Sequence, residues 1–162
     1  MKRIALIIGL ASLPLALVAT AAATPPTTTT AEFPRITPHF LSCPDFDVRG
    51  QWQITRVTTT FYDQSGAPIR IERHLSYVGS LSNPSTGKSL PDAGNVLVTV
   101  DLQAGTVTSD GRGRVDTAPG LGVILHESGM FTFLGDELIA EAGQHDTLDG
   151  NLGPLCDYLA SS

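Results

Sequence analysis

The sequence has little charge, little cysteine and few aromatic residues. Of 162 residues, 16% are charged, 6% are aromatic and two are cysteines. Two cysteines are too few for a disulfide-framework miniprotein or a cysteine-rich zinc module. The chain is nevertheless 41% hydrophobic, which is enough for the core of one domain and too much for a wholly disordered protein.

Basic residues are scarce beyond the first segment. Without residues 1–23 the chain keeps 8 basic and 16 acidic residues, and Lys88 is its only remaining lysine. A chain this acidic is repelled by phosphate backbones and by anionic membranes. We therefore expect no nucleic-acid partner.

The first 23 residues predict an export signal. Lys2 and Arg3 precede an apolar run from Ile4 to Val18. Two small-residue motifs suited to signal peptidase follow, one ending at Ala21 and the other at Ala23. This order is typical of a secretory signal peptide, and cleavage after Ala21 or Ala23 predicts a secreted protein with no transmembrane segment left. An uncleaved anchor is the alternative, but no basic stop-transfer cluster follows. The threonine- and proline-rich residues 24–41 predict a disordered linker.

The remaining residues, 42–162, read as one β domain. Apolar residues alternate with polar ones, most clearly where Ile69, Ile71, Leu75, Tyr77 and Leu81 share one face. Turn signals are expected at residues 83–88, 103–105, 110–111, 119–120, 127–129 and 135–136. The spacing predicts an all-β fold, an antiparallel barrel or sandwich of seven to eight strands.

Two local features refine this prediction. Trp52 and Ile54 have the opposite parity to Val57 and Phe61, so a bulge near Arg56 would turn both sets toward the core. Near the end of the chain, leucines and Cys156 follow a helical period after Pro154 and predict a short C-terminal helix.

Cys43 and Cys156 lie at opposite ends of the predicted domain. Two cysteines of an exported protein usually pair, so we expect a Cys43–Cys156 disulfide.

Chemical motifs are sparse. Thr86-Gly87-Lys88-Ser89 lacks the first glycine of a phosphate-binding loop, and neither GxSxG nor HExxH occurs. His145, Asp146 and Asp149 form only a loose cluster of metal-ligand types, so we predict neither a metal nor a cofactor. Arg112 and Arg114 flank Gly113 in what we expect to be a solvated turn.

Arg73 is the residue of greatest interest, because its parity turns it toward the apolar face. A guanidinium there needs a carboxylate or an anionic ligand, unless the strand end or a bulge leaves it at the rim. Candidate ligand-binding residues are therefore Arg73 with His74, Tyr77 and His126, whereas no catalytic set of nucleophile, base and orienting group is visible.

The segments 81–89, 111–114 and 118–122, followed by Leu155-Cys156, resemble small exported β-rich proteins of actinobacteria without an assigned activity. This resemblance implies export, a β-rich fold and a disulfide between the first and last cysteine, and it implies no catalytic residue.

Two functions remain open. The first is a secreted, non-catalytic binding or envelope-associated module for a small molecule or an envelope component. The second is a small barrel that carries a ligand or works as an enzyme at an interior polar pocket. A pocket of several hundred Å3 with convergent polar groups would favour the second, and a filled interior the first.

Overall fold

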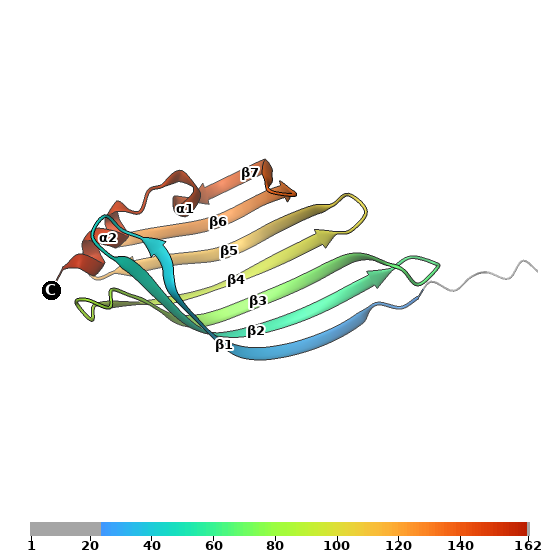
Figure 1. Cartoon of the computed structure of the whole chain (residues 1–162), viewed down its shortest axis with the longest axis horizontal. Coiled ribbons are helices and arrows are strands. Elements are labelled where there is room, and N and C mark those ends of the chain that lie inside the picture. Colours follow the sequence, from blue (N-terminus) through green and yellow to red (C-terminus); the bar gives the residue numbers. More distant parts are fainter. Residues whose placement is uncertain (1–23, 162) are drawn as a thin grey trace, which may run out of the picture.

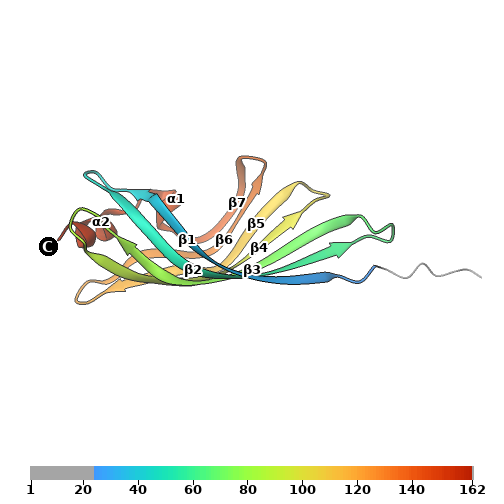
Figure 2. The ribbon, with the colours of Figure 1, turned by 60° about the horizontal axis from the view of Figure 1, so that its bottom comes forward.

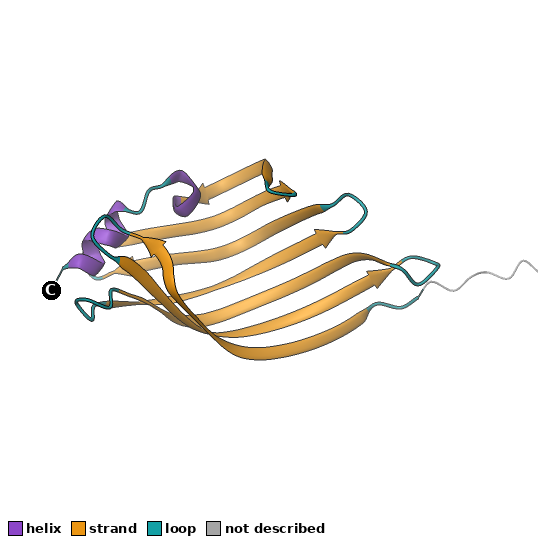
Figure 3. Cartoon of the chain, viewed as in Figure 1, coloured by secondary structure: helices purple, strands orange, loops and turns teal. Residues whose placement is uncertain are grey.

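The computed structural model describes residues 24–161, and the expected signal segment lies outside them. Seven strands are followed by two short helices (Figures 1 and 3). In chain order they are β1 (Thr27–Ser42), β2 (Asp47–Tyr62), β3 (Pro68–Ser82), β4 (Ser89–Asp101), β5 (Thr106–Ala118), β6 (Gly122–Leu134), β7 (Glu137–His145), α1 (Asp146–Asp149) and α2 (Gly153–Ala160).

All seven strands form one antiparallel sheet in the order of the sequence. The sheet is curved but not closed, so β1 and β7 remain its two edges (Figure 2). The predicted all-β class and the C-terminal helix are confirmed, and the closed form of the barrel is not adopted.

One end of the sheet carries the core. Val48, Trp52, Leu81 and Leu90 lie on one face, here called the inner face, and α2 packs against it. From α2, Leu155 and Leu159 are fully buried in the same cluster. Apolar alternation thus continues along the whole sheet, but only one end of it is covered.

A disulfide and two hydrogen bonds fix α2 in place. The predicted disulfide is present, with 2.03 Å between the sulfurs of Cys43 and Cys156. The Asn83 side-chain amide and the Thr86 hydroxyl, both in the loop after β3, donate to the carbonyl oxygen of Leu159 at 3.2 Å each. Both ends of the β domain are therefore joined at the core.

The expected linker is wrong for most of its length. Residues from Thr27 onward form β1, which pairs with β2 from Thr27↔Thr60 to Ser42↔Asp47. Threonine is a strong strand former because its branched Cβ suits a pleated sheet. Pro34 and Pro38 are tolerated because β1 is an edge strand, where missing amide donors face no partner.

The expected bulge near Arg56 is also absent. The register between β2 and β3 runs unbroken from Arg49↔Ser82 to Phe61↔Arg70. Val57 and Phe61 therefore lie on the outer face, opposite to Trp52. No bulge is needed, because the far half of the sheet has no closed core that would require both sets inside.

Two expected turns are strand interiors. Asp110-Gly111 lies within β5, and residues 127–129 lie within β6. Gly111 and Gly129 face each other in the ladder, both with positive φ. These glycines therefore allow local distortions of the backbone within the strands, and the chain does not reverse at them.

Among residues 24–161, no helix is long and apolar enough to cross a membrane.

Candidate functional site

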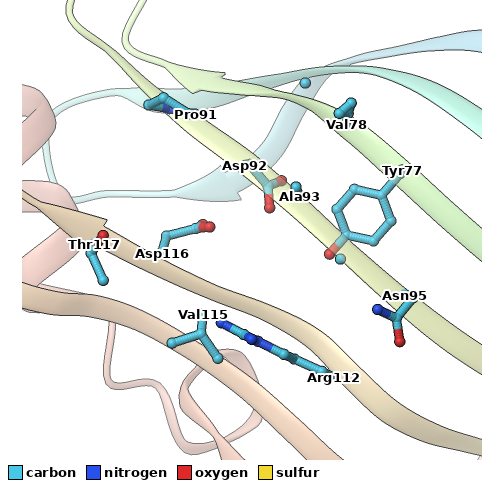
Figure 4. Close-up of a pocket in the computed structure, with 12 residues that line it drawn as sticks. Tyr77, Val78, Pro91, Asp92, Ala93, Asn95, Arg112, Val115, Asp116 and Thr117 are labelled. Atoms are coloured by element: carbon cyan, nitrogen blue, oxygen red, sulfur yellow. The ribbon is translucent and has the colours of Figure 1, made fainter.

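The sheet splits between β4 and β5. These strands pair only from Leu97↔Asp110 to Asp101↔Thr106, so their halves nearest the core are not hydrogen-bonded to each other. A cleft of about 600 Å3 lies there. It is lined by Tyr77, Val78, Gly79, Pro91, Asp92, Ala93, Gly94, Asn95, Arg112, Val115, Asp116 and Thr117 (Figure 4).

A glycine pair marks the place where the ladder ends. The backbones approach so closely that a Cβ on Gly94 would lie 1.5 Å from the carbonyl oxygen of Gly113. That oxygen accepts a hydrogen bond from the Tyr77 hydroxyl of β3, a side chain in place of a β4 amide. Close approach without a side chain is the usual reason for glycine inside a strand.

A bulge at Gly113 determines which β5 residues face inward. Before it, Val107 and Ser109 share the inner face with Val100 and Val98. The register with β6 shifts between Arg112 and Arg114, which reverses the alternation. Arg114 and Asp116 thereby turn inward, so the expectation of a solvated turn around Arg114 is wrong.

Arg114 lies in a nest of aromatic rings. Its side chain is 12% exposed, and its guanidinium carbon lies 4.6 Å from the centre of the Phe40 ring, 5.9 Å from Trp52 and 5.7 Å from Tyr77. Phe40 belongs to β1, four strands away, so the curvature of the sheet brings this contact about. Burial would lower the pKa of Arg114, but the charge of Asp92 and the Tyr77 hydroxyl outweigh it and raise that pKa.

Two buried carboxylates accompany this cation. Asp92 is 1% exposed and Asp116 is 4% exposed. The Trp52 indole N–H donates to Asp92 Oδ2 at 2.6 Å, and Arg114 Nε lies 3.5 Å from Asp92 Oδ1. Figure 4 shows the Asp92 and Asp116 side chains pointing toward one another from facing strands.

Burial changes the protonation of both acids. It raises the pKa of Asp116 to about 7, with the charge of Asp92 adding to the rise and Arg114 opposing it. Burial also raises the pKa of Asp92, against the opposing effects of Arg114 and the Trp52 hydrogen bond. Near neutral pH, Asp116 therefore either accepts or donates a proton in hydrogen bonds, whereas Arg114 stays charged.

One oxygen of each carboxylate has no hydrogen-bond partner among the described residues. These are Asp92 Oδ1 and Asp116 Oδ2. Val78, Ala93 and Val115 of the lining have outer-face parity, so the cleft leads from the outer face to the carboxylates. Buried acceptors without partners are rare and costly, and their position at the floor of a cleft makes them available to a ligand.

The four predicted site residues lie in different places. Tyr77 alone lines the cleft. Arg73 is half-buried on the inner face, as its parity predicted, opposite Thr58 and Val98 and away from the cleft. His74 is exposed on the outer face, and His126 lies in β6, where its Nε2 is 2.7 Å from the Ser128 hydroxyl. The structure does not bring the four together.

Sequence reasoning missed Asp92, Asp116, Arg114 and Trp52. Asp92 has the parity of Leu90 and Val96, a signal that was present in the alternation. Asp116 and Arg114 carried no such signal, because their inward orientation depends on the bulge at Gly113.

Metal binding finds no support in the described residues. Among them, no group of three or more His, Cys, Asp or Glu side chains is arranged to hold a metal ion. His145, Asp146 and Asp149 thus form no such group, and Asp146 instead accepts from the His126 backbone amide at 2.7 Å.

Comparisons with protein-family models, with curated proteins and with solved structures find no match to this chain. The site is therefore assigned from its own geometry.

Proposed function

We propose that this protein is a secreted, non-catalytic binding module that takes a small ligand rich in N–H or O–H donors in the cleft between β4 and β5. The observation that carries the proposal is a pair of buried carboxylate oxygens at the floor of that cleft, Asp92 Oδ1 and Asp116 Oδ2, which accept no hydrogen bond from the described residues. Asp92 Oδ1 has only the longer ion-pair contact of 3.5 Å with Arg114 Nε. Such acceptors gain most from a ligand that donates hydrogen bonds, such as an organic amine or a polyol.

The size and lining of the cleft support a small molecule as the ligand. About 600 Å3 lies within the range of small-molecule sites. Aliphatic walls from Val78, Pro91 and Val115 surround the polar groups, and Asn95 and Arg112 add further donors. This combination of apolar walls and a few convergent polar groups is typical of specific ligand pockets.

A non-catalytic role is supported by the small size of the cavity beside a serine that could act as a nucleophile. His126 and Ser128 form a close pair in β6, but the cavity that Ser128 lines measures about 30 Å3. That volume is about the share of one water molecule. The cavity that Ser128 lines is therefore too small for a substrate.

The Cys43–Cys156 bridge supports a location of this protein outside the cytoplasm, because structural disulfides persist in oxidising compartments.

The test is a binding screen by ligand-observed NMR with small amines, polyols and carboxylates on the folded protein. We expect amines or polyols to bind in preference to carboxylates. Asp116→Asn and Asp92→Asn should each weaken binding about tenfold or more, since hydrogen bonds to charged groups are worth roughly 1.5–3 kcal/mol. Asp110→Asn, at an exposed position of the same strand β5, is the matched control. Binding unchanged in both cleft variants would overturn the assignment.

A second function is favoured by one observation. The pKa of about 7 for Asp116 is that of a group suited to general acid–base chemistry at neutral pH. Chemical change of any bound ligand during the NMR titration, abolished in Asp116→Asn, would make the cleft an active site.

A further inference from the structure

The far half of the inner face is an apolar floor that nothing in the described chain covers. From the rim of the core outward, the inward positions of β2 to β6 are mostly aliphatic, aromatic or hydroxyl-bearing, and all except the buried Ile54 are accessible in part. The apolar members are Ile54, Ile71, Leu75, Val96, Val98, Val100, Val107, Phe131 and Phe133.

Beyond the level of Arg114 and Glu127, which face each other on β5 and β6, two arginines are the only charged residues at the inward positions of β2 to β6. Arg56 lies opposite Leu75, and Arg73 lies opposite Thr58. The two arginines are therefore diagonal neighbours on adjacent strands, with Cβ atoms about 7 Å apart in a regular sheet. Two guanidinium groups at this spacing suit one carboxylate or another small anionic head group.

Neither arginine is neutralised by the described residues. Arg56 stacks over Phe33 with its guanidinium carbon 5.3 Å from the ring centre, and its buried Nε has no hydrogen-bond partner there. No ion pair involves Arg73 in the described chain, whereas Arg70 on the outer face pairs with Glu72 at 3.3 Å. Arg56 and Arg73 thus leave positive charge without an ion-pair partner among the described residues on the inner face.

The floor leads into an apolar pocket. A cavity of about 200 Å3 adjoins Leu75 on the side of the core, and its walls are mainly hydrophobic. It is lined by Arg35, Phe40, Trp52, Ile54, Leu75, Tyr77, Val96 and Arg114. Six of these eight residues are apolar or aromatic; of the two arginines, Arg114 is engaged with Asp92 and Arg35 comes from the edge strand β1.

We propose that the inner face binds a single-chain anionic amphiphile such as a fatty acid, with its head group on Arg56 and Arg73 and its hydrocarbon chain along the aliphatic floor into the pocket beside Leu75. Charge complementarity favours this occupant over a second copy of the chain, because two copies face to face would bring four unpaired arginines together. The net negative charge of the chain likewise favours a monomeric ligand over an anionic membrane surface.

The test uses dansyl-labelled undecanoic acid in a fluorescence titration of the intact protein. We expect saturable binding with enhanced dansyl emission, displacement by dodecanoate, and at least about tenfold weaker displacement by dodecanol. The Arg56→Gln/Arg73→Gln double variant should lose about tenfold or more in affinity. Arg70→Gln, which removes an arginine from the outer face of the same strand β3, should bind as wild type.

Several outcomes would overturn the proposal. They are no saturable binding, equal displacement by dodecanol and dodecanoate, or an unchanged double variant. The alcohol comparison needs only the wild-type protein, so it decides the matter even if the double variant does not fold. If the protein co-sediments with phosphatidylglycerol–phosphatidylcholine vesicles but does not bind the free acid, the inner face binds a membrane instead. If light scattering shows a dimer that does not bind the probe, the inner face binds a second copy of the chain instead. Asp116→Asn should leave the titration unchanged, so this site and the cleft can fail separately.

Discussion

The protein is expected to be more stable in mild acid than at neutral pH, which is unusual for a protein rich in carboxylates. The cause is Asp116, whose pKa is raised from 3.8 to about 7 by burial and by the neighbouring charge of Asp92. Between these two values the unfolded chain has lost the proton and the folded chain still holds it. Because the folded state then binds more protons, stability falls as pH rises through this window and levels off above it.

The size of the effect follows from the same window. One unit of pKa corresponds to about 1.4 kcal/mol, so the full shift sets an upper limit of about 4 kcal/mol. The titration of Asp116 is coupled to the charges of Asp92 and Arg114, so the full shift does not belong to this one group. We therefore expect about 2 kcal/mol less stability at pH 8 than at pH 5, as an order of magnitude.

Other acids limit the stability at the lower end. The hydrogen bond from His39 holds the pKa of Asp47 below its usual range, and the hydrogen bond from Ser65 does the same for Asp63. Groups with lowered pKa values stabilise the fold above their unfolded pKa of 3.8 and lose this contribution as pH falls further. Stability should therefore be greatest between pH 4 and pH 5, to within about a unit.

Urea unfolding at a series of pH values, with the disulfide intact, measures this dependence. Asp116→Asn should flatten the decline between pH 5 and pH 8, because the amide does not titrate and keeps the shape of the side chain. Asp110→Asn, at an exposed position of β5, should keep the wild-type slope. A wild-type stability that rises or stays level from pH 5 to pH 8 would refute the reasoning, as would an unaltered slope in Asp116→Asn.

Four further outcomes are expected. Trp52→Phe removes the indole donor that binds Asp92 at 2.6 Å, and should cost about 1–3 kcal/mol in urea unfolding; no loss would mean that water replaces the indole. Gly94→Ala places a Cβ 1.5 Å from a backbone oxygen of β5, and should cost about 3 kcal/mol or more; wild-type stability would show that the strands separate easily there. Replacing both Cys43 and Cys156 by serine should cost about 2–5 kcal/mol, and an unchanged melting temperature would contradict a structural role for the bridge. Intact-mass analysis of exported protein should show the loss of about 21 or 23 residues, and a full-length, membrane-retained species would contradict export.

Much of the fold follows from local pattern. The strict alternation from Ile69 to Leu81 predicts β3 and its inner face, and the helical spacing from Leu152 to Leu159 predicts α2. The Cys43–Cys156 bridge follows from the position of the two cysteines at the ends of the domain. These features depend on neighbours in sequence or on a single pair, so composition and period are sufficient.

The site depends on information that alternation does not carry. Its β5 half is set by a one-residue shift at Gly113, and a shift of one residue moves every later side chain to the other face. Arg114 and Asp116 read as exposed when the alternation is continued from Val107, yet both are largely buried. The Arg112-Gly113-Arg114 spacing suggested a turn, because glycine between polar residues is more common there than in a strand. A second missing element is β1, whose threonines resemble a linker in composition and a strand in propensity.

The split in the sheet and the helix beside it belong to one arrangement. Where two neighbouring strands are no longer hydrogen-bonded to each other, their backbone groups are left unpaired and other contacts must hold the strands at a fixed distance. Here α2 contributes Leu155 and Leu159 to a cluster that includes Leu90 of β4 on one side of the split, and Ala118 of β5 and Leu125 of β6 on the other. Side-chain packing on the inner face thus replaces the missing ladder, while the outer face stays open as the cleft.

The disulfide then has a role beyond the stability of the chain ends. Cys156 lies in α2 itself, so the bridge to Cys43 holds the helix whose leucines share a buried cluster with residues from both sides of the split. Loosening α2 would allow β4 and β5 to move relative to each other, and with them Asp92 and Asp116, the two carboxylates that face one another across the cleft. We therefore expect that reduction of this bridge lowers the affinity of the ligand site proposed for the cleft, and not only the stability of the fold.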